Sequence, residues 1–264
     1  MKRTTYILIG LLISGLIVIV ASIITISLIG KEDTLDKIYL GDENAQLRLG
    51  RVHTVKVLVN QGEPDKRILT SGMIAVTSAS VGKGNISYPK SECFKVRQKE
   101  DTLLIEVDLS VYATSERYKN SHFLVVDDLK INLAVDSTLK CIVAGGANGT
   151  LHFKGIQSDS LLIRAYNQRV ELDSCQFRSF DLGGAQFSFS GVNSKIKNYY
   201  LDLNGVENWT FQNTEVDTEY LSGSGQHTNN LGKGECQRVV WRPYTQDATL
   251  QITLHEGAEV NVAH

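Results

Sequence analysis

The strongest constraint on the fold is a repeat of about twenty residues in the second half of the chain. Divided at its small-residue turns, this half gives four successive segments of similar pattern, 144–163, 164–182, 183–203 and 204–221. Each segment begins with a turn rich in Gly or Asn, continues into a short alternating strand and ends in a second strand. A β-propeller blade needs about 40–50 residues and does not fit this length. The repeat predicts one coil of a parallel β-solenoid, in which each strand pairs with its equivalent one coil later.

Alternation in the first strand of each repeat predicts which side chains point inward. We expect the aromatic members to stack inside the coil on their equivalents about 4.8 Å away, and the polar members to face solvent. The inward set is Phe187, Phe189, Trp209 and Phe211, and the outward set is Ser188 and Thr210. An antiparallel sandwich with evenly spaced hairpins is the alternative. The period is weaker in residues 45–140, which also fit a sandwich-like cap.

From about residue 45 onward the sequence has no stretch of helical period. Short alternating runs, such as 55–59, 103–107 and 129–133, are separated by Gly, Asn, Asp and Ser. The chain has only three prolines, so few strands lose a ladder hydrogen bond. The fold class predicted for this region is therefore all-β.

The N-terminal residues 6–29 form a run of apolar and small residues without a charge. As a helix the run would be about 36 Å long, against about 30 Å for the hydrocarbon core of a bilayer. The apolar core of a signal peptide has only about 7–15 residues, and no clean A-x-A-like cleavage site follows this run. The sequence predicts an uncleaved, single-pass transmembrane helix. A cleaved signal peptide and a buried core helix are the alternatives.

The flanks of this run predict its orientation. Lys2 and Arg3 precede it, so the positive-inside tendency leaves a cytoplasmic tail of residues 1–5. The predicted order is then an anchor at 6–29, a linker at 30–45 and an extracytoplasmic, periplasmic β-solenoid domain at 46–264, with its clearest repeats at 144–225. The formal net charge of −2 gives no reason to expect a nucleic-acid partner.

Three pieces of the sequence resemble a known family. They are LGRVHTVKV at 49–57, DTLLI at 101–105 and LSGSG at 221–225. With the basic N-terminus and the single membrane segment, they resemble the DUF2807 family of Bacteroidetes, labelled "putative auto-transporter adhesin, head GIN domain", over about residues 45–225. The family's repeated Ser-Gly-Ser-Gly-Asp pattern occurs once here, with Gln226 in place of Asp. The resemblance implies a right-handed parallel β-helix in the cell envelope and transfers no catalytic residues.

The sequence lacks the motifs of common catalytic and cofactor sites. It has no HExxH, no G-x-S-x-G, no phosphate loop and no dinucleotide fingerprint, so we predict no catalytic, cofactor-binding or metal-binding residues. The six histidines have no metal-ligand spacing. His152, between Leu151 and Phe153, is expected to face solvent from a strand.

Two carboxylates nevertheless support an alternative hypothesis, that the protein is an enzyme. Asp181 and Asp202 occupy what look like equivalent outward positions in neighbouring repeats, and Glu171 is also expected to face outward. Carboxylates about 5–9 Å apart are the geometry of glycoside hydrolysis. A polysaccharide-processing enzyme using Asp181 and Asp202 is therefore the alternative function. Alternation alone also places polar residues at these positions.

The four cysteines do not form a C-x-x-C motif. In an exported domain they could pair in three ways, which the sequence does not distinguish. Cys175 aligns with Ile156 and Val192 of the neighbouring repeats, which predicts a buried, apolar thiol. The four are Cys93, Cys141, Cys175 and Cys236.

The preferred function is that of a non-enzymatic, membrane-anchored envelope protein, adhesin-like or acting as a scaffold. Its predicted partners are the membrane, through residues 6–29, and an envelope protein or a glycan. Tyr199, Tyr200 and Tyr220 are candidates for aromatic contact with such a partner, and they fit equally well as ladder residues.

Overall fold

The chain forms two compact units, Met1–Thr34 and Leu35–His264. A computed structural model describes most of both units. The described residues are 2–29, 35–62, 67–118, 121, 123–146, 148–232, 235–255 and 257–263.

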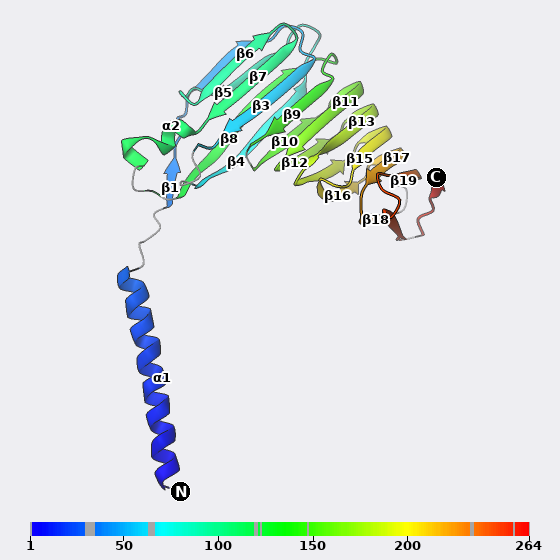
Figure 1. Cartoon of the computed structure of the whole chain (residues 1–264). Coiled ribbons are helices and arrows are strands. Elements are labelled where there is room, and N and C mark those ends of the chain that lie inside the picture. Colours follow the sequence, from blue (N-terminus) through cyan, green and yellow to red (C-terminus); the bar gives the residue numbers. More distant parts are fainter. Residues whose placement is uncertain are drawn as a thin grey trace. The chain divides into compact units, whose positions relative to one another are not determined.

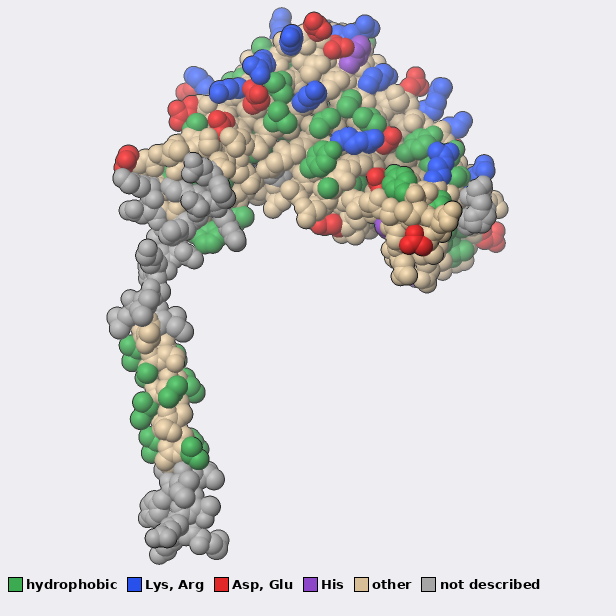
Figure 2. Space-filling model, in the orientation of Figure 1, with side chains coloured by type: hydrophobic (Ala, Val, Ile, Leu, Met, Phe, Trp, Pro, Cys, Tyr) green, Lys and Arg blue, Asp and Glu red, His purple; other side chains and the backbone are tan. Residues whose placement is uncertain are grey.

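The first unit is a single helix, α1 (Lys2–Ile29). Its side chains are described at residues 10–25, and all of them are exposed, including large apolar ones such as Leu12 and Ile17. Figure 2 shows hydrophobic side chains on several sides of this helix. As far as the chain is described, no helix is both long and apolar enough to cross a membrane. The predicted segment 6–29 extends beyond the described side chains at both ends.

The second unit consists mainly of strands (Figure 1). The strands of its first half are β1 (Leu35–Ile38), β2 (Asn44–Arg48), β3 (Thr54–Asn60), β4 (Arg67–Ser78), β5 (Asn85–Pro89), β6 (Phe94–Lys99), β7 (Thr102–Asp108), β8 (Phe123–Val135) and β9 (Cys141–Gly145). Between β7 and β8 lie the short helix α2 (Ser110–Ala113) and the 3-10 turn η1 (Glu116–Tyr118). The prediction that the chain is all-β after its N-terminal segment is therefore confirmed.

The second half continues the same pattern to the C-terminus. Its strands are β10 (Gly149–Lys154), β11 (Gln157–Tyr166), β12 (Gln168–Asp173), β13 (Gln176–Ala185), β14 (Phe187–Val192), β15 (Lys195–Asp202), β16 (Val206–Gln212), β17 (Glu215–Gly223), β18 (Gln226–Leu231), β19 (Cys236–Pro243), β20 (Thr249–Leu254) and β21 (Asn261–Ala263).

These strands form two large sheets and one small one in the described part of the chain. Sheet 1 has the order β16-β14-β12-β10-β4-β8-β5-β2, with β1 also paired to β8. Sheet 2 has the order β21-β19-β17-β15-β13-β11-β9-β3-β7-β6, and sheet 3 contains β18 and β20. The inner faces of sheets 1 and 2 meet in one core, where the rings of Phe180 and Phe189 lie 5.7 Å apart.

In the second half, each strand of the large sheets from β10 to β19, except β16, pairs in parallel with the strand two places later in the chain. In sheet 1, Leu151 pairs with Val170, Val170 with Phe189 and Phe189 with Trp209. The predicted inward side chains do face the core: Phe187 and Phe189 are buried, and Trp209 and Phe211 are half-buried against it.

The register between repeats differs from the one expected. The alignment of strand starts matches Phe187 with Trp209, whereas in the structure Phe189 pairs with Trp209 and Gly191 with Phe211. A slip of two residues keeps every side chain on the same face because the period of a strand is two. The sequence pattern therefore predicts the face and leaves the register open.

The corners between strands use residues in the left-handed conformation. Asn167, Ser174, Gln186 and Asn193 have φ between 50° and 56°. Asparagine tolerates this conformation better than most residues with a Cβ, since its short amide can bond locally. Repeated corners of this kind allow the chain to turn after only a few strand residues.

Residues 45–140 do not form a separate sandwich. Strands β3, β7 and β9 are parallel neighbours in sheet 2, and β4, β8 and β10 are parallel neighbours in sheet 1. Antiparallel pairing involves β2, β5 and β6 at the end of the stack. Strand β1 and the start of β2 lie within the stretch 30–45 that was predicted as a linker.

All four cysteines are free thiols. Cys175 is buried, as predicted, although Gln176 pairs with Lys195 and so matches Cys175 to Ser194, not to Val192. The Cys175 backbone N–H donates to Ser194 Oγ at 3.0 Å. Burial raises the pKa of the Cys236 thiol to about 12, so this side chain stays neutral at physiological pH.

Candidate functional site

Asp181 and Asp202 both line a groove of about 240 Å³ on the outer face of sheet 2. Tyr200, Tyr220 and Tyr244 line it as well, and we call it the tyrosine groove. The groove also contains Arg164, Gly183, Gly184, Leu201, Ser222 and Arg242.

The two carboxylates are not at equivalent positions. Asp181 pairs with Tyr200, and Asp202 pairs with Ser222 in the next strand. Strand spacing and rise put the Cα atoms of the two aspartates about 8 Å apart, on a diagonal. Their oxygens are engaged in structural bonds: Asp181 Oδ1 lies 2.8 Å from Arg164 Nη1, and Asp202 Oδ1 accepts the Asn204 N–H at 3.0 Å.

The three tyrosines named from the sequence divide between core and surface. Tyr199 is fully buried in the core, so it cannot contact a partner. Tyr200 and Tyr220 face outward, with rings stacked 4.6 Å apart and 9° from parallel. The Arg242 guanidinium lies 4.9 Å from the centre of the Tyr220 ring on its other side. The two outer rings therefore form a stack with one another and with a cation.

The other polar residues considered from the sequence lie on the surface. His152 and Glu171 face outward from sheet 1, with 3.2 Å between Nδ1 and Oε2. His122 and His264 lie outside the described residues. Within the described ranges, no group of three or more His, Cys, Asp or Glu side chains could hold a metal ion.

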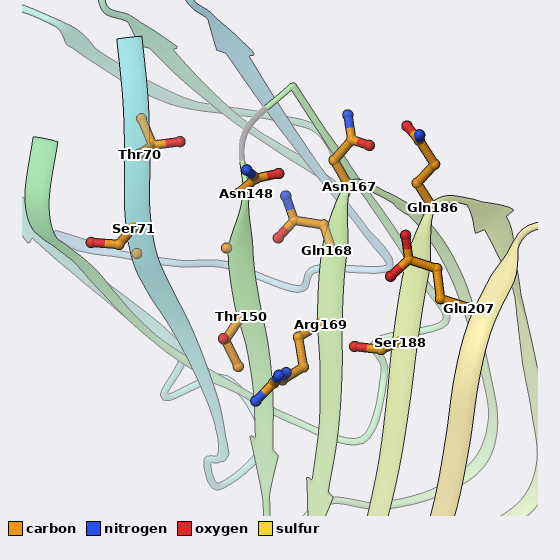
Figure 3. Close-up of a pocket in the computed structure, with 12 residues that line it drawn as sticks. Thr70, Ser71, Asn148, Thr150, Asn167, Gln168, Arg169, Gln186, Ser188 and Glu207 are labelled. Atoms are coloured by element: carbon orange, nitrogen blue, oxygen red, sulfur yellow. The ribbon is translucent and has the colours of Figure 1, made fainter. Parts of the chain in front are cut away.

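A second groove, which the sequence reasoning missed, lies on the outer face of sheet 1 (Figure 3). It has a volume of about 500 Å³ and runs across β4, β10, β12, β14 and β16 near their starts. We call it the amide groove. It is lined by Thr70, Ser71, Gly72, Asn148, Gly149, Thr150, Asn167, Gln168, Arg169, Gln186, Ser188 and Glu207.

Three amides of this groove come from successive repeats. Asn148, Asn167 and Gln186 precede paired strands and are spaced 19 residues apart in the sequence. Neighbouring strands are about 4.8 Å apart, so these corners present a row of amides at that spacing. Figure 3 shows Asn148, Asn167 and Gln186 along one rim of the groove. Their 19-residue interval is the sequence signal that could have revealed this row, and by itself it indicates only turn chemistry.

Thr70 supplies a buried hydroxyl at the same groove. Its side chain is 7% exposed, and Oγ1 has no hydrogen-bond partner among the described residues. The pairing of β4 with β8 shifts register between Thr70 and Gly72, which displaces the strand at this point. In Figure 3 the Thr70 hydroxyl points toward the groove. A buried hydroxyl left unpaired costs about 1–3 kcal/mol, so a ligand that bonds to it would recover this energy.

The charges of the amide groove balance. Arg169 and Glu207 are its only ionised side chains, and every other side chain that lines it is a hydroxyl or an amide. Arg169 is also 3.9 Å from Glu171. A neutral groove of groups that both donate and accept hydrogen bonds favours a neutral ligand with the same dual capacity.

No family model matches the chain, and no curated protein matches it. The resemblance to DUF2807 therefore stays a prediction.

Solved structures give distant similarities. A "putative adhesin" from Bacteroides fragilis is 15% identical, with 86% of this chain and 100% of that chain covered and a TM-score of 0.43. A "putative lipid binding protein" from Parabacteroides distasonis is 10% identical, with coverage of 88% and 100% and a TM-score of 0.38. A "putative adhesin" from Parabacteroides merdae is 11% identical, with coverage of 87% and 99% and a TM-score of 0.29. These neighbours thus carry adhesin or lipid-binding names.

Proposed function

We propose that this protein is a non-enzymatic, membrane-anchored binding protein of the cell envelope that holds a neutral glycan in its amide groove. The observation that carries the proposal is the row of amides from three successive repeats beside the unpartnered Thr70 hydroxyl.

The β unit serves this function as a right-handed parallel β-solenoid. Its parallel ladders, with partners 19 or 20 residues apart, support stacked coils. Right-handed connections between parallel strands of one sheet are the strong general rule. A stack of this kind presents long, flat outer faces and repeats each surface group at the strand spacing, which suits a ligand that is itself extended.

The helix α1 serves as the anchor, with the N-terminus in the cytoplasm and the β unit outside. The uncharged run 6–29, the basic residues before it and the exposed apolar side chains at 10–25 support this assignment. In alkaline extraction of membranes, the full-length protein should stay in the membrane pellet. Release of the intact protein into the soluble fraction would contradict the anchor.

A glycan fits the amide groove because its hydroxyls both donate and accept hydrogen bonds, as amides and the Thr70 hydroxyl do. The groove does not attract a charged polymer, because the positive charge of Arg169 and the negative charge of Glu207 give its lining no net charge. Catalysis at Asp181 and Asp202 is not part of the proposal, because both carboxylates are held by Arg164 and by backbone.

Binding of neutral oligosaccharides by the full-length protein in detergent, measured by calorimetry, tests the proposal. The probes are cellohexaose, chitohexaose and maltohexaose. Asn167→Gly and Gln186→Gly remove the amides while keeping the positive φ of 56° and 53°. Each lost hydrogen bond contributes about 1 kcal/mol, so each variant should weaken binding about fivefold.

Asn193→Gly is the matched control. Asn193 is also a corner residue, with φ of 50°, and it does not line the amide groove. The control should bind like the wild type. If none of the three hexasaccharides binds, or if the control weakens binding as much as Asn167→Gly does, the amide groove is not the site.

A further inference from the structure

Arg242 is an uncompensated cation at one end of the tyrosine groove. Its guanidinium lies over the Tyr220 ring, and it forms no ion pair with any carboxylate in the described part of the chain. Arg164, also in the groove, is neutralised by Asp181 at 2.8 Å. The groove therefore contains one arginine that is held by a ring and still has its N–H groups available for an anion.

Hydroxyl groups lie beside this cation. Ser222 pairs with Arg242 across neighbouring strands, and Ser222 Oγ lies 3.0 Å from Tyr244 Oη. Each hydroxyl has one proton, and Ser222 Oγ donates to the Leu201 carbonyl oxygen at 3.4 Å. Tyr244 Oη can then donate to an oxygen anion bound at the guanidinium, so Arg242 and Tyr244 form a site for one planar anionic group at the end of the groove.

Two glycines, Gly183 and Gly184, line the groove on β13, and Gly183 pairs with Arg164 of β11. A Cβ at Gly184 would lie 1.8 Å from the Ala165 carbonyl oxygen, so position 184 accepts no side chain. Gly183 is buried, and a Cβ there would lie 3.3 Å from Arg164 Nη1, so a side chain at this position would displace the guanidinium that pairs with Asp181.

Asp202 provides a hydrogen-bond acceptor in the part of the groove away from Arg242. It lies in the same row as Ser222 and Arg242, two strand spacings or about 10 Å from Arg242. Its Oδ1 accepts the Asn204 N–H, which leaves carboxylate lone pairs for ligand hydroxyls. A ligand that fits has one anionic end, neutral donors beyond it, and a ring that packs against the edges of Tyr200 and Tyr220.

We propose that the tyrosine groove is a second binding site, specific for an oligosaccharide that carries a carboxylate, such as a uronic acid. The sugar carboxylate binds Arg242 and Tyr244, and hydroxyls of the adjoining sugar donate to Asp202. A highly charged anion such as phosphate is disfavoured because Asp181 and Asp202 both line the groove. This site is separate from the amide groove, which lies on sheet 1.

The test is calorimetric binding to the full-length protein in detergent of a monouronate trisaccharide, with one terminal glucuronate and two glucose units, and the comparison probe is the same trisaccharide with its carboxyl group reduced. The monouronate trisaccharide should bind at least tenfold more tightly than its reduced counterpart, and salt should weaken its binding. Arg242→Gln should weaken it at least tenfold. Arg238→Gln, the same change on the same strand outside the groove, is the matched control and should leave it unchanged.

Gly183→Leu supplies a second, steric test, because its side chain should displace Arg164 into the groove and weaken binding while circular dichroism shows the native β spectrum. Asn167→Gly should leave binding of the monouronate trisaccharide intact, so a failure of the amide-groove proposal is distinguishable from a failure of this one. Equal binding of the two trisaccharides, equal competition by inorganic phosphate, or wild-type binding by Arg242→Gln would each overturn the proposal.

Discussion

The interior of the middle repeats differs from the interior of the repeat that contains β17. One inward row of sheet 2 runs through Leu161, Phe180, Tyr199, Glu219 and Val239. In the middle repeats this row is apolar and continues into ring contacts, with Phe180 and Tyr199 5.9 Å apart. In β17 the same position holds a carboxyl group that is fully buried, and the row is apolar again at Val239 in β19.

The buried carboxyl of Glu219 is only partly satisfied. Its Oε2 accepts from Asn229 Nδ2 at 3.0 Å, while Oε1 has no partner within the described residues. Burial raises the pKa of Glu219 to about 7 and that of Tyr199 well above its ordinary value. Sheet 1 also ends at β16 here, and β18 pairs instead with β20. The difference teaches that apolar ring contacts hold the middle repeats together, whereas at β17 a polar contact joins sheet 2 to β18 of the small sheet.

Phe180→Ala should produce the largest effect, because it removes a fully buried ring that contacts Phe177, Phe189 and Tyr199. Such a truncation leaves a cavity and lowers the free energy of unfolding by about 3–5 kcal/mol. Denaturant unfolding followed by circular dichroism measures it. Phe211→Ala removes a half-buried ring on the edge strand β16 and should lower the free energy of unfolding by less. If it lowers it as much as Phe180→Ala does, the special contribution of the buried rings in the middle repeats is contradicted.

Glu219→Gln should change the pH dependence of stability. The unfolded chain releases this proton near the ordinary glutamate pKa of 4.5, whereas the folded protein keeps it to about 7. Between these values the folded state binds more protons, so the free energy of unfolding falls as pH rises, and the full penalty is present above pH 7.

The pKa difference corresponds to about 3 kcal/mol, which Glu219→Gln should recover at pH 8 and not at pH 4. Unfolding curves at both pH values measure the change. Glu207→Gln, at an exposed glutamate on β16, is the control and should show no such difference. If the free energy of unfolding of the wild-type protein does not change between pH 4.5 and 7, the raised pKa of Glu219 is contradicted.

Tyr199→Phe should have the smallest effect. The Tyr199 hydroxyl is buried without a partner in the described part of the chain, so its removal loses no bond there. Stability should stay the same or rise by up to about 1 kcal/mol. A loss above 1 kcal/mol in the same unfolding assay would mean that the hydroxyl is bonded in the folded protein.

Much of the fold follows from local patterns. The alternation of Phe187 and Phe189 with Ser188 predicts the inward face correctly, and the twenty-residue spacing agrees with the steps between paired strands. The candidate sites follow less well. Asp181 and Asp202 were expected to be equivalent, yet Asp181 pairs with Tyr200. Considered in the sequence alone, Asn167 and Gln186 indicate only turns. Thr70, which lines the same groove in the structure, lies far away along the chain.

The sequence by itself determines the strand content, the face of each side chain and the approximate length of a repeat, because these depend on a period of two and on turn residues. Only the tertiary structure decides the register between repeats, since a slip of two residues leaves every face unchanged. That register selects the neighbours of each surface group: Arg242 beside Ser222, and Arg164 against Asp181. It also places Glu219 in a row of core residues, where burial and not its local sequence raises its pKa.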